Sequence, residues 1–200
     1  MHTPKRSPLT AGFTLVELLT VIAIIAILMG ILFPTIGSAI ESAKKTQAKS
    51  DCLQIVNAVK AYYTEYGKYP LATADTTYNG STQAELLDIL RAPSSQTAWV
   101  TNNPRKIVFL EVPDAKNLNQ PETKQKAGIS STRKWLDPWG NPYQVMIDGN
   151  YDNSLANPYT NAGSALLSTG VIAWSIGRDA LGGSGDKTTG NAKDDVISWQ

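Results

Sequence analysis

The stretch AGFTLVELLTVIAIIAILMGILFP, residues 11–34, decides how this 200-residue chain is organised. From Phe13 to Phe33 it is almost wholly apolar, and as an α-helix it would span about 30 Å, the thickness of a bilayer's hydrocarbon core. Glu17 is the only ionisable residue inside this run. A charge at the centre of a membrane helix costs on the order of 3 kcal/mol, so such a residue usually has a partner. We therefore expect a membrane helix whose single carboxylate has a specific role.

The rest of the chain has an ordinary globular composition. The whole sequence is 42% hydrophobic and 18% charged with a net charge of +1, so nothing indicates a nucleic-acid partner. Cys52 is the only cysteine, which excludes an intrachain disulfide, and we expect it to be a small buried filler. The only histidine, His2, precedes the apolar run, so no histidine-based catalysis is indicated beyond it. The sequence predicts a protein that is not an enzyme.

A short polar segment with Lys5 and Arg6 precedes the apolar run. Basic residues before an apolar stretch are typical of a targeting segment whose start stays in the cytoplasm. We predict a leader at 1–12, a transmembrane and assembly helix at 13–35 and a periplasmic head at 36–200. By hydropathy alone, an uncleaved signal anchor is the alternative.

Residues 12–17, GFTLVE, resemble the type IV prepilin signature, which type IV pilins share with the pseudopilins of type II secretion. The resemblance implies that a membrane prepilin peptidase cuts between Gly12 and Phe13 and methylates the new N-terminus. Glu17 is then the fifth residue of the mature chain, and the N-terminal amine of a neighbouring subunit is its implied partner. The alternative is a glutamate that snorkels towards the lipid headgroups.

Periodicity predicts that the helix continues, amphipathic, from Ile36 to Tyr66, with a bend at Pro34. A second helix is expected from about Thr82 to Arg91, where Thr82 and Glu85 have capping-box spacing. Strands are predicted at 107–112, 143–147 and 171–175. The fold class is α+β and pilin-like: one long helix, half transmembrane and half amphipathic, packed on a small antiparallel β-sheet head.

Two further segments are similar to the major pseudopilin of type II secretion. The first is DPWGNPY, residues 137–143, which in that family leads into the sheet of the head. The second is SIGRDALGG, residues 175–183, followed by DDVISW, residues 194–199, which is similar to the family's calcium-binding end.

Independently of that resemblance, the C-terminal loop is rich in hard oxygen ligands and glycine. Asp179, Asp186, Asp194 and Asp195 suit Ca²⁺, which takes six to eight oxygen ligands, and the absence of histidine or cysteine there argues against zinc. Carried over by position, the resemblance implies as ligands Asp179, either Asp186 or Asp195, the backbone carbonyl of Ile176 and the hydroxyl of Thr188. A disordered Gly/Asp tail is the alternative.

These observations predict a structural subunit of a type II secretion pseudopilus or a related type IV pilus-like filament. The implied partners are the prepilin peptidase, identical and related pilin-like subunits, the inner-membrane assembly platform and the membrane itself. The expected location is the inner membrane, crossed once, with the C-terminal domain in the periplasm. One alternative is a type IV pilin for adhesion, motility or DNA uptake. Another is a monomeric, signal-anchored periplasmic binding domain.

Overall fold

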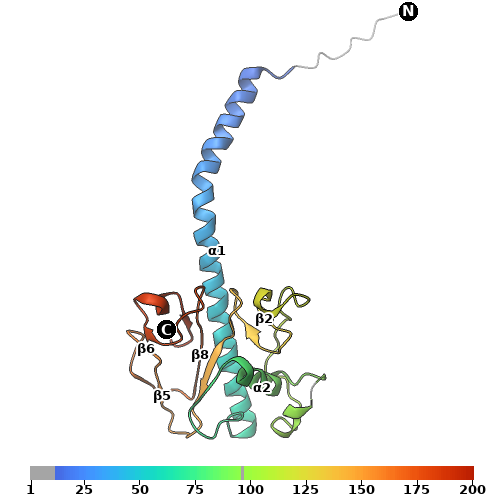
Figure 1. Ribbon diagram of the computed structural model, residues 1–200, viewed down its shortest axis with the longest axis vertical. Helices are drawn as coiled ribbons and strands as arrows, with labels where there is room; N and C mark the ends of the chain where they lie inside the picture. Colours follow the sequence, from blue (N-terminus) through green and yellow to red (C-terminus); the bar gives the residue numbers. More distant parts are fainter. Residues whose placement is uncertain (1–11, 96) are drawn as a thin grey trace, which may run out of the picture. The chain divides into compact units, whose positions relative to one another are not determined.

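The computed structural model describes residues 12–95 and 97–200, apart from the side chains of 32–35. The predicted leader, 1–12, therefore lies outside the described residues except for Gly12. The chain divides into two compact units, Met1–Ser42 and Ala43–Gln200. The 52-residue helix α1 (Leu15–Tyr66) contributes to both, and it is the blue-to-teal helix in Figure 1.

In the first unit, α1 is apolar and exposed. Every side chain from Phe13 to Ile31 is exposed, including Leu15 at 86% and Ile24 at 58%. No single helix of the described chain meets the length and hydropathy of a membrane span, but Leu15–Ile31 and Ile36–Tyr66 meet them together, as a pair bent by 42°. The bend falls where Pro34 predicts one, across the four residues whose side chains are not described.

In the second unit, α1 buries one face. Fully buried side chains recur at spacings of three or four residues, the period of an amphipathic helix; they are Ala48, Cys52, Ile55, Val59 and Tyr62. This confirms the predicted buried position of Cys52. The helix ends at Tyr66, and Gly67 follows with φ at 65° and donates its N–H to the carbonyl of Tyr63.

The buried face of α1 packs on a four-stranded antiparallel sheet with the order β1-β4-β8-β10. The strands are β1 (Thr76–Tyr78), β4 (Gln144–Ile147), β8 (Val171–Ser175) and β10 (Val196–Ile197). β4 and β8 confirm two predicted strands. Two contacts tie the helix to the edge strand β10: Lys49 Nζ donates to the carbonyl of Ile197 at 2.7 Å, and Cys52 Sγ lies 3.9 Å from the carbonyl oxygen of Val196.

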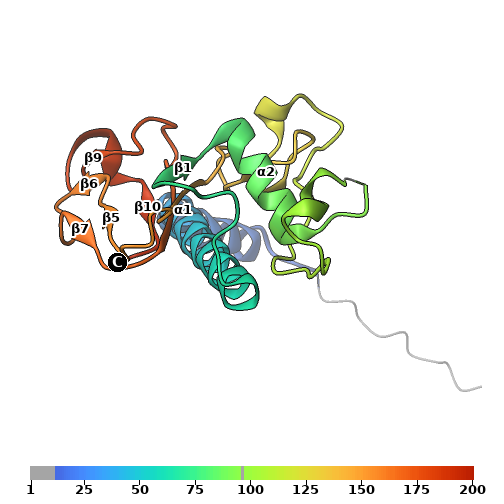
Figure 2. The same ribbon diagram turned by 90° about the horizontal axis from the view of Figure 1, so that it is seen from below.

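Helix α2 (Gly80–Arg91) packs its apolar residues into the same core. Figure 2 shows α2 on one side of the head's part of α1 and the strands β5, β6, β7 and β9 on the other. The helix is predicted correctly but its cap is not, because α2 begins two residues before Thr82. Asn79 occupies the N-cap and donates its backbone N–H to Thr82 Oγ1 at 2.9 Å. Asparagine is among the best N-cap residues, so the cap lies one turn earlier than predicted.

The strand predicted at 107–112 is wrong. No ladder forms there in the described chain; the N–H groups of Phe109 and Leu110 both donate to the carbonyl of Leu90 in the last turn of α2. A free carbonyl at the end of α2 therefore accepts the hydrogen bonds that these N–H groups would have donated to a neighbouring strand.

Short elements complete the head. The small pairs are β2 (Gly128–Ile129) with β3 (Trp135–Leu136), β5 (Leu155–Ala156) with β7 (Leu166–Leu167), and β6 (Tyr159–Thr160) with β9 (Gly185–Asp186), the last pair parallel. The 3₁₀ turns are η1 (Ala98–Thr101), η2 (Glu122–Lys124) and η3 (Gly190–Lys193).

Candidate assembly helix and acidic loop

Glu17 lies in the first turn of α1 and forms a capping box with Thr14. The backbone N–H and the hydroxyl of Thr14 each donate to Glu17 Oε2 at 2.8 Å, and the N–H of Glu17 lies 3.2 Å from Thr14 Oγ1. The sequence TLVE, residues 14–17, has the spacing that this reciprocal cap requires. Within the described chain Glu17 makes no ion pair. Its carboxylate is therefore held by hydrogen bonds to Thr14.

Gly12 and Phe13 precede this turn. Both are exposed, Phe13 at 78%, and a Cβ added to Gly12 would meet no atom within 4 Å. Packing among the described residues therefore does not require a glycine at position 12.

Strand pairing builds a second site at the end of the head. β8 and β10 are antiparallel partners with Ser175 opposite Val196, so the residues after β8 lie beside those before β10. One carboxylate oxygen from each of Asp179, Asp194 and Asp195 comes within 4.8 Å of the others. We call these three residues the acidic trio. All three are among the four aspartates that residue type selects in the sequence, and Asp179 and Asp195 also belong to the ligand set that the resemblance implies.

Backbone donors from the turn after β8 hold Asp194. Its Oδ2 accepts the N–H of Arg178 at 2.6 Å and that of Asp179 at 3.2 Å. Gly177 has φ at 70°, and a Cβ there would lie 2.6 Å from the same oxygen. Only glycine permits this close approach.

Asp195 is the buried member of the trio. Only 4% of it is exposed, and its Oδ2 accepts the hydroxyl of Tyr159 at 2.5 Å and the N–H of Gly183 at 3.0 Å. Its Oδ1 is buried and has no hydrogen-bond partner in the described chain. Burial raises the pKa of the Asp195 carboxyl, and burial next to Asp195 raises that of Tyr159. A buried carboxylate oxygen without a partner costs free energy, which a cation would offset.

Asp186 and Thr188, also predicted as ligands, bond to each other instead. Asp186 Oδ1 accepts the N–H of Thr188 at 2.9 Å and its hydroxyl at 2.7 Å, which lowers the pKa of Asp186 to about 2. Neither residue is part of the acidic trio. Ile176 is half-buried directly after β8, next to the turn that carries Asp179.

Comparison with known proteins reports two kinds of match. A family model described as the prokaryotic N-terminal methylation motif matches residues 9–33. The chain is 31% identical over 139 residues to the type II secretion system core protein G of Pseudomonas aeruginosa, covering 70% of this chain and 75% of that protein. It is 31% identical over 150 residues to the protein of the same name from Escherichia coli, covering 74% of this chain and 81% of that protein.

A shorter match joins the chain to a pilin. It is 33% identical over 69 residues to the type IV major pilin protein PilA of Myxococcus xanthus, covering 34% of this chain and 31% of that protein. The comparison with solved structures found no match.

Proposed function

Because this chain belongs to the family of type II secretion system core protein G, we propose that it is a structural subunit of a type II secretion pseudopilus or a closely related filament. The observation that carries the proposal is the exposed apolar part of α1 with Glu17 in its first turn. Such a surface needs lipid or other helices around it. The role is structural, and no catalytic activity is proposed.

The route to the filament begins with processing. Prepilin peptidase removes residues 1–12 and methylates Phe13, and residues 13–35 anchor the chain in the inner membrane with the head in the periplasm. The assembly platform then passes the subunit into a filament of identical and related subunits. The match to the N-terminal methylation motif and the basic residues Lys5 and Arg6 support this order.

Within this proposal, Glu17 exchanges partners. In the single chain its carboxylate accepts two hydrogen bonds from Thr14. A neighbouring subunit with a free N-terminus offers an ammonium group, a charged donor in place of the neutral donors of Thr14. Assembly therefore replaces a local cap by an ion pair between subunits, which also sets their axial register.

We further propose that the acidic trio binds Ca²⁺. The residues fit a hard cation because three carboxylates converge and the buried Oδ1 of Asp195 has no hydrogen-bond partner among the described residues. Asp179, Asp194 and Asp195 would hold the ion, with the carbonyl of Ile176 as a further donor. The bound ion would offset two of the three negative charges and join the ends of β8 and β10, a structural role in a chain that cannot form an intrachain disulfide.

A second candidate function is a type IV pilin, which the match to the Myxococcus xanthus pilin favours. That match covers about a third of this chain, against about 70% for the core protein G relatives. The pseudopilus therefore remains the better-supported assignment.

The proposal is tested in cells that contain a prepilin peptidase and a pseudopilus assembly platform. We expect mature protein that begins at N-methylated Phe13, by intact-mass measurement, and filaments by electron microscopy. Gly12→Val should block cleavage. Since a Cβ at position 12 meets no atom of the described residues within 4 Å, we expect lost cleavage to reflect the peptidase rather than misfolding. Wild-type protein that keeps Met1 in such cells would contradict the proposed processing.

A further inference from the structure

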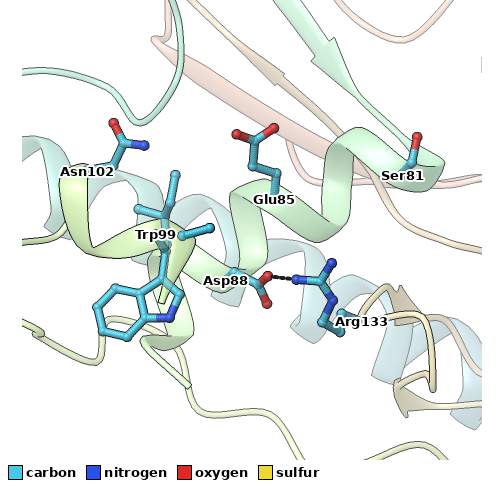
Figure 3. Close-up of a pocket in the computed structure, with 8 residues that line it drawn as sticks. Ser81, Glu85, Asp88, Trp99, Asn102 and Arg133 are labelled. Atoms are coloured by element: carbon cyan, nitrogen blue, oxygen red, sulfur yellow. Dashed lines mark hydrogen bonds and ion pairs between the residues drawn. The ribbon is translucent and has the colours of Figure 1, made fainter. Parts of the chain in front are cut away.

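A cavity of about 310 Å³ lies beside α2, and Asp88, Trp99 and Arg133 are among the residues that line it. Figure 3 shows Asp88 and Arg133 facing each other, and their side chains form an ion pair. Because the buried carboxylate of this cavity has its cationic partner within the chain, we assign no ligand to it. A different feature of the head, a group of exposed tyrosines at the end of α1, has side chains that are both reachable and chemically reactive.

The tyrosine cluster consists of Tyr63 in the last turn of α1, Tyr69 just after the helix and Tyr151 shortly before β5. The rings of Tyr63 and Tyr69 stack, with their centroids 4.6 Å apart and their planes at 30°. Tyr151 stacks on Tyr69 with a centroid distance of 5.5 Å, and its hydroxyl oxygen accepts the backbone N–H of Tyr69 at 3.0 Å. Three phenol rings are thus held together by stacking and a hydrogen bond.

The cluster is both open to solvent and fixed in place. Tyr63 is 40% exposed and Tyr151 is 47% exposed, while Tyr69 is half-buried between them and the body of the head. A Cβ added to Gly170 would overlap the hydroxyl and ring of Tyr69, so the absence of a side chain there gives Tyr69 its place against the backbone. A small oxidant in solution can therefore reach a pair of rings whose separation the fold already sets.

A second pair of tyrosines on α1 has the same separation without the same access. Tyr62 and Tyr66 have ring centroids 4.7 Å apart, with their planes at 44°. Tyr62 is fully buried, and its hydroxyl donates to the carbonyl of Asn102 at 2.6 Å. The hydroxyl of Tyr66 donates to Asn103 Oδ1, also at 2.6 Å. Burial and these hydrogen bonds shield the second pair, so an oxidant from solvent should act on the first.

We propose that Tyr63 and Tyr69 are a site of oxidative cross-linking, at which a dityrosine bond forms. The co-reactant is a one-electron oxidant, such as a haem peroxidase that consumes hydrogen peroxide. Each phenol gives one electron to the oxidant and its proton to water. The two phenoxyl radicals join through a carbon–carbon bond between the carbons next to their hydroxyl-bearing carbons, and the hydrogens on those carbons move to the phenolic oxygens. The two electrons and two protons convert one hydrogen peroxide into two waters.

The cross-link would tie the last turn of α1 to the segment that follows Gly67. It would act as a covalent brace in a chain whose single cysteine excludes an intrachain disulfide. Like a disulfide, it would restrict the unfolded chain, although the loop that it closes is short. The proposal does not rest on filament assembly, because the whole cluster belongs to the second unit.

The test treats the full chain, dilute and in detergent micelles, with a haem peroxidase and hydrogen peroxide. We expect a monomeric product that has lost two hydrogen atoms by intact mass and that shows dityrosine fluorescence. Trypsin cleaves after Lys60, Lys68 and Arg91, so Tyr63 and Tyr69 fall on separate peptides, 61–68 and 69–91. The cross-link should join these two peptides, and fragmentation in the mass spectrometer should assign the bond to Tyr63 and Tyr69.

Phenylalanine variants keep the ring packing and remove one phenol at a time. Tyr63→Phe and Tyr69→Phe should each abolish the cross-link between the two peptides. Tyr66→Phe is the matched control, because Tyr66 lies on the same helix in a ring pair of similar separation, and it should leave the yield unchanged. Tyr151→Phe should also keep the cross-link, since Tyr151 only backs the ring of Tyr69.

Four results would each overturn the proposal. One is wild-type protein that keeps both hydrogen atoms under conditions that oxidise free tyrosine to dityrosine. The second is cross-linking only between chains, and the third is an intrachain bond assigned to another pair, including Tyr69 with Tyr151. The fourth is an unchanged yield of the joined peptides from folded Tyr63→Phe or Tyr69→Phe.

Discussion

The two parts of α1 form one helix but depend on different partners. From Leu15 to Ile31 every side chain is exposed although nearly all are apolar. From Ala48 to Tyr62 one face is fully buried against the sheet and α2. Hydropathy and periodicity predict both parts as helix, but among the described residues only the second part packs against other elements of the chain. The second part is therefore stabilised by contacts within the head, whereas the first part needs lipid or other proteins to cover its apolar surface.

The size of the difference follows from apolar burial. Moving an exposed Leu or Ile side chain fully out of water contributes about 1.5–3 kcal/mol. The first part of α1 carries a long series of such side chains, so its burial in lipid or among other subunits releases a large free energy that the isolated chain does not realise. Glu17 is the charged exception in that series, and we expect it to favour burial among other subunits over burial in lipid.

The largest expected effect is therefore at Glu17. Glu17→Val should leave membrane insertion intact or improved, because an apolar helix gains from losing a charge. Filament assembly should fall by more than about a hundredfold, since the N-terminal ammonium of a neighbour loses its buried partner. The measurement is the amount of subunit in the membrane fraction and in sheared filaments.

Thr20→Val is the matched control for this prediction. Thr20 lies on the same helix, and its hydroxyl donates to the carbonyl of Glu17 at 2.9 Å. This variant should assemble normally. Filaments of Glu17→Val at wild-type yield would show that burial of the apolar surface alone drives assembly.

A paired substitution sharpens the comparison within the helix. Ile55 is fully buried and Ile24 is 58% exposed. Ile55→Ala should lower the free energy of unfolding of the head by about 2–5 kcal/mol, because it removes buried methyl groups and leaves a cavity. Ile24→Ala should change it by less than about 0.5 kcal/mol. Denaturant unfolding of the full chain in detergent, followed by tryptophan fluorescence, measures the free energy of unfolding of both variants. Equal losses of stability would contradict the difference between the two parts of α1.

Much of this division can be predicted from the sequence, because it rests on local periodicity. Apolar residues recur at helical spacing from Ile36 to Tyr66, and Val171–Trp174 is a continuous apolar run, so α1 and β8 are predicted correctly. The segment 107–112 has the same composition as a strand and yet is none, because the N–H groups of Phe109 and Leu110 bond to Leu90 at the end of α2, 19 and 20 residues earlier. Composition cannot show which partner a backbone donor finds.

The acidic loop shows the same limit at the candidate site. Residue types alone select four aspartates, and nothing local separates Asp186 from Asp194. The pairing of β8 with β10 brings Asp194 and Asp195 to Asp179, while Asp186 turns to Thr188. A prediction that placed the ligands by strand register, rather than by position in a motif, would have included Asp194.

Calcium should act on the part of α1 that the head stabilises, because Asp194 and Asp195 directly precede β10, which contacts Lys49 and Cys52. Binding to the folded state alone adds about 2.7 kcal/mol at a hundredfold excess over Kd. The head should therefore melt at a higher temperature with millimolar Ca²⁺ than with chelator, and Mg²⁺ should substitute poorly.

Two aspartate substitutions test which carboxylates hold the calcium. Asp194→Asn should abolish the difference in melting temperature, and Asp186→Asn should keep it. If Asp186→Asn loses the difference in melting temperature and Asp194→Asn keeps it, the ligands implied by the resemblance are favoured. If Ca²⁺ does not change the melting temperature of metal-free wild type, the proposed calcium site is wrong.

The smallest expected effect concerns pH and Asp51, on the buried part of α1. Asp51 is 7% exposed and its Oδ2 accepts the hydroxyl of the fully buried Tyr143 at 2.7 Å. Burial raises the pKa of Asp51 above its ordinary value of 3.8, and the hydrogen bond from Tyr143 partly opposes that rise. Folding therefore favours the protonated carboxyl. The contribution of Asp51 to stability is fully present below pH 3.8 and is lost as the pH rises through its higher folded-state pKa.

The measurement is the free energy of unfolding of wild type and two variants across that window. Asp51→Asn cannot titrate, so wild type should lose stability relative to it as the pH rises. Tyr143→Phe removes the hydrogen bond that lowers the pKa of Asp51, so the loss in this variant should be steeper and extend to higher pH. Parallel curves for wild type and Asp51→Asn would show that this carboxylate is as well solvated in the folded head as in the unfolded chain, and that the buried face of α1 is less dry than its packing indicates.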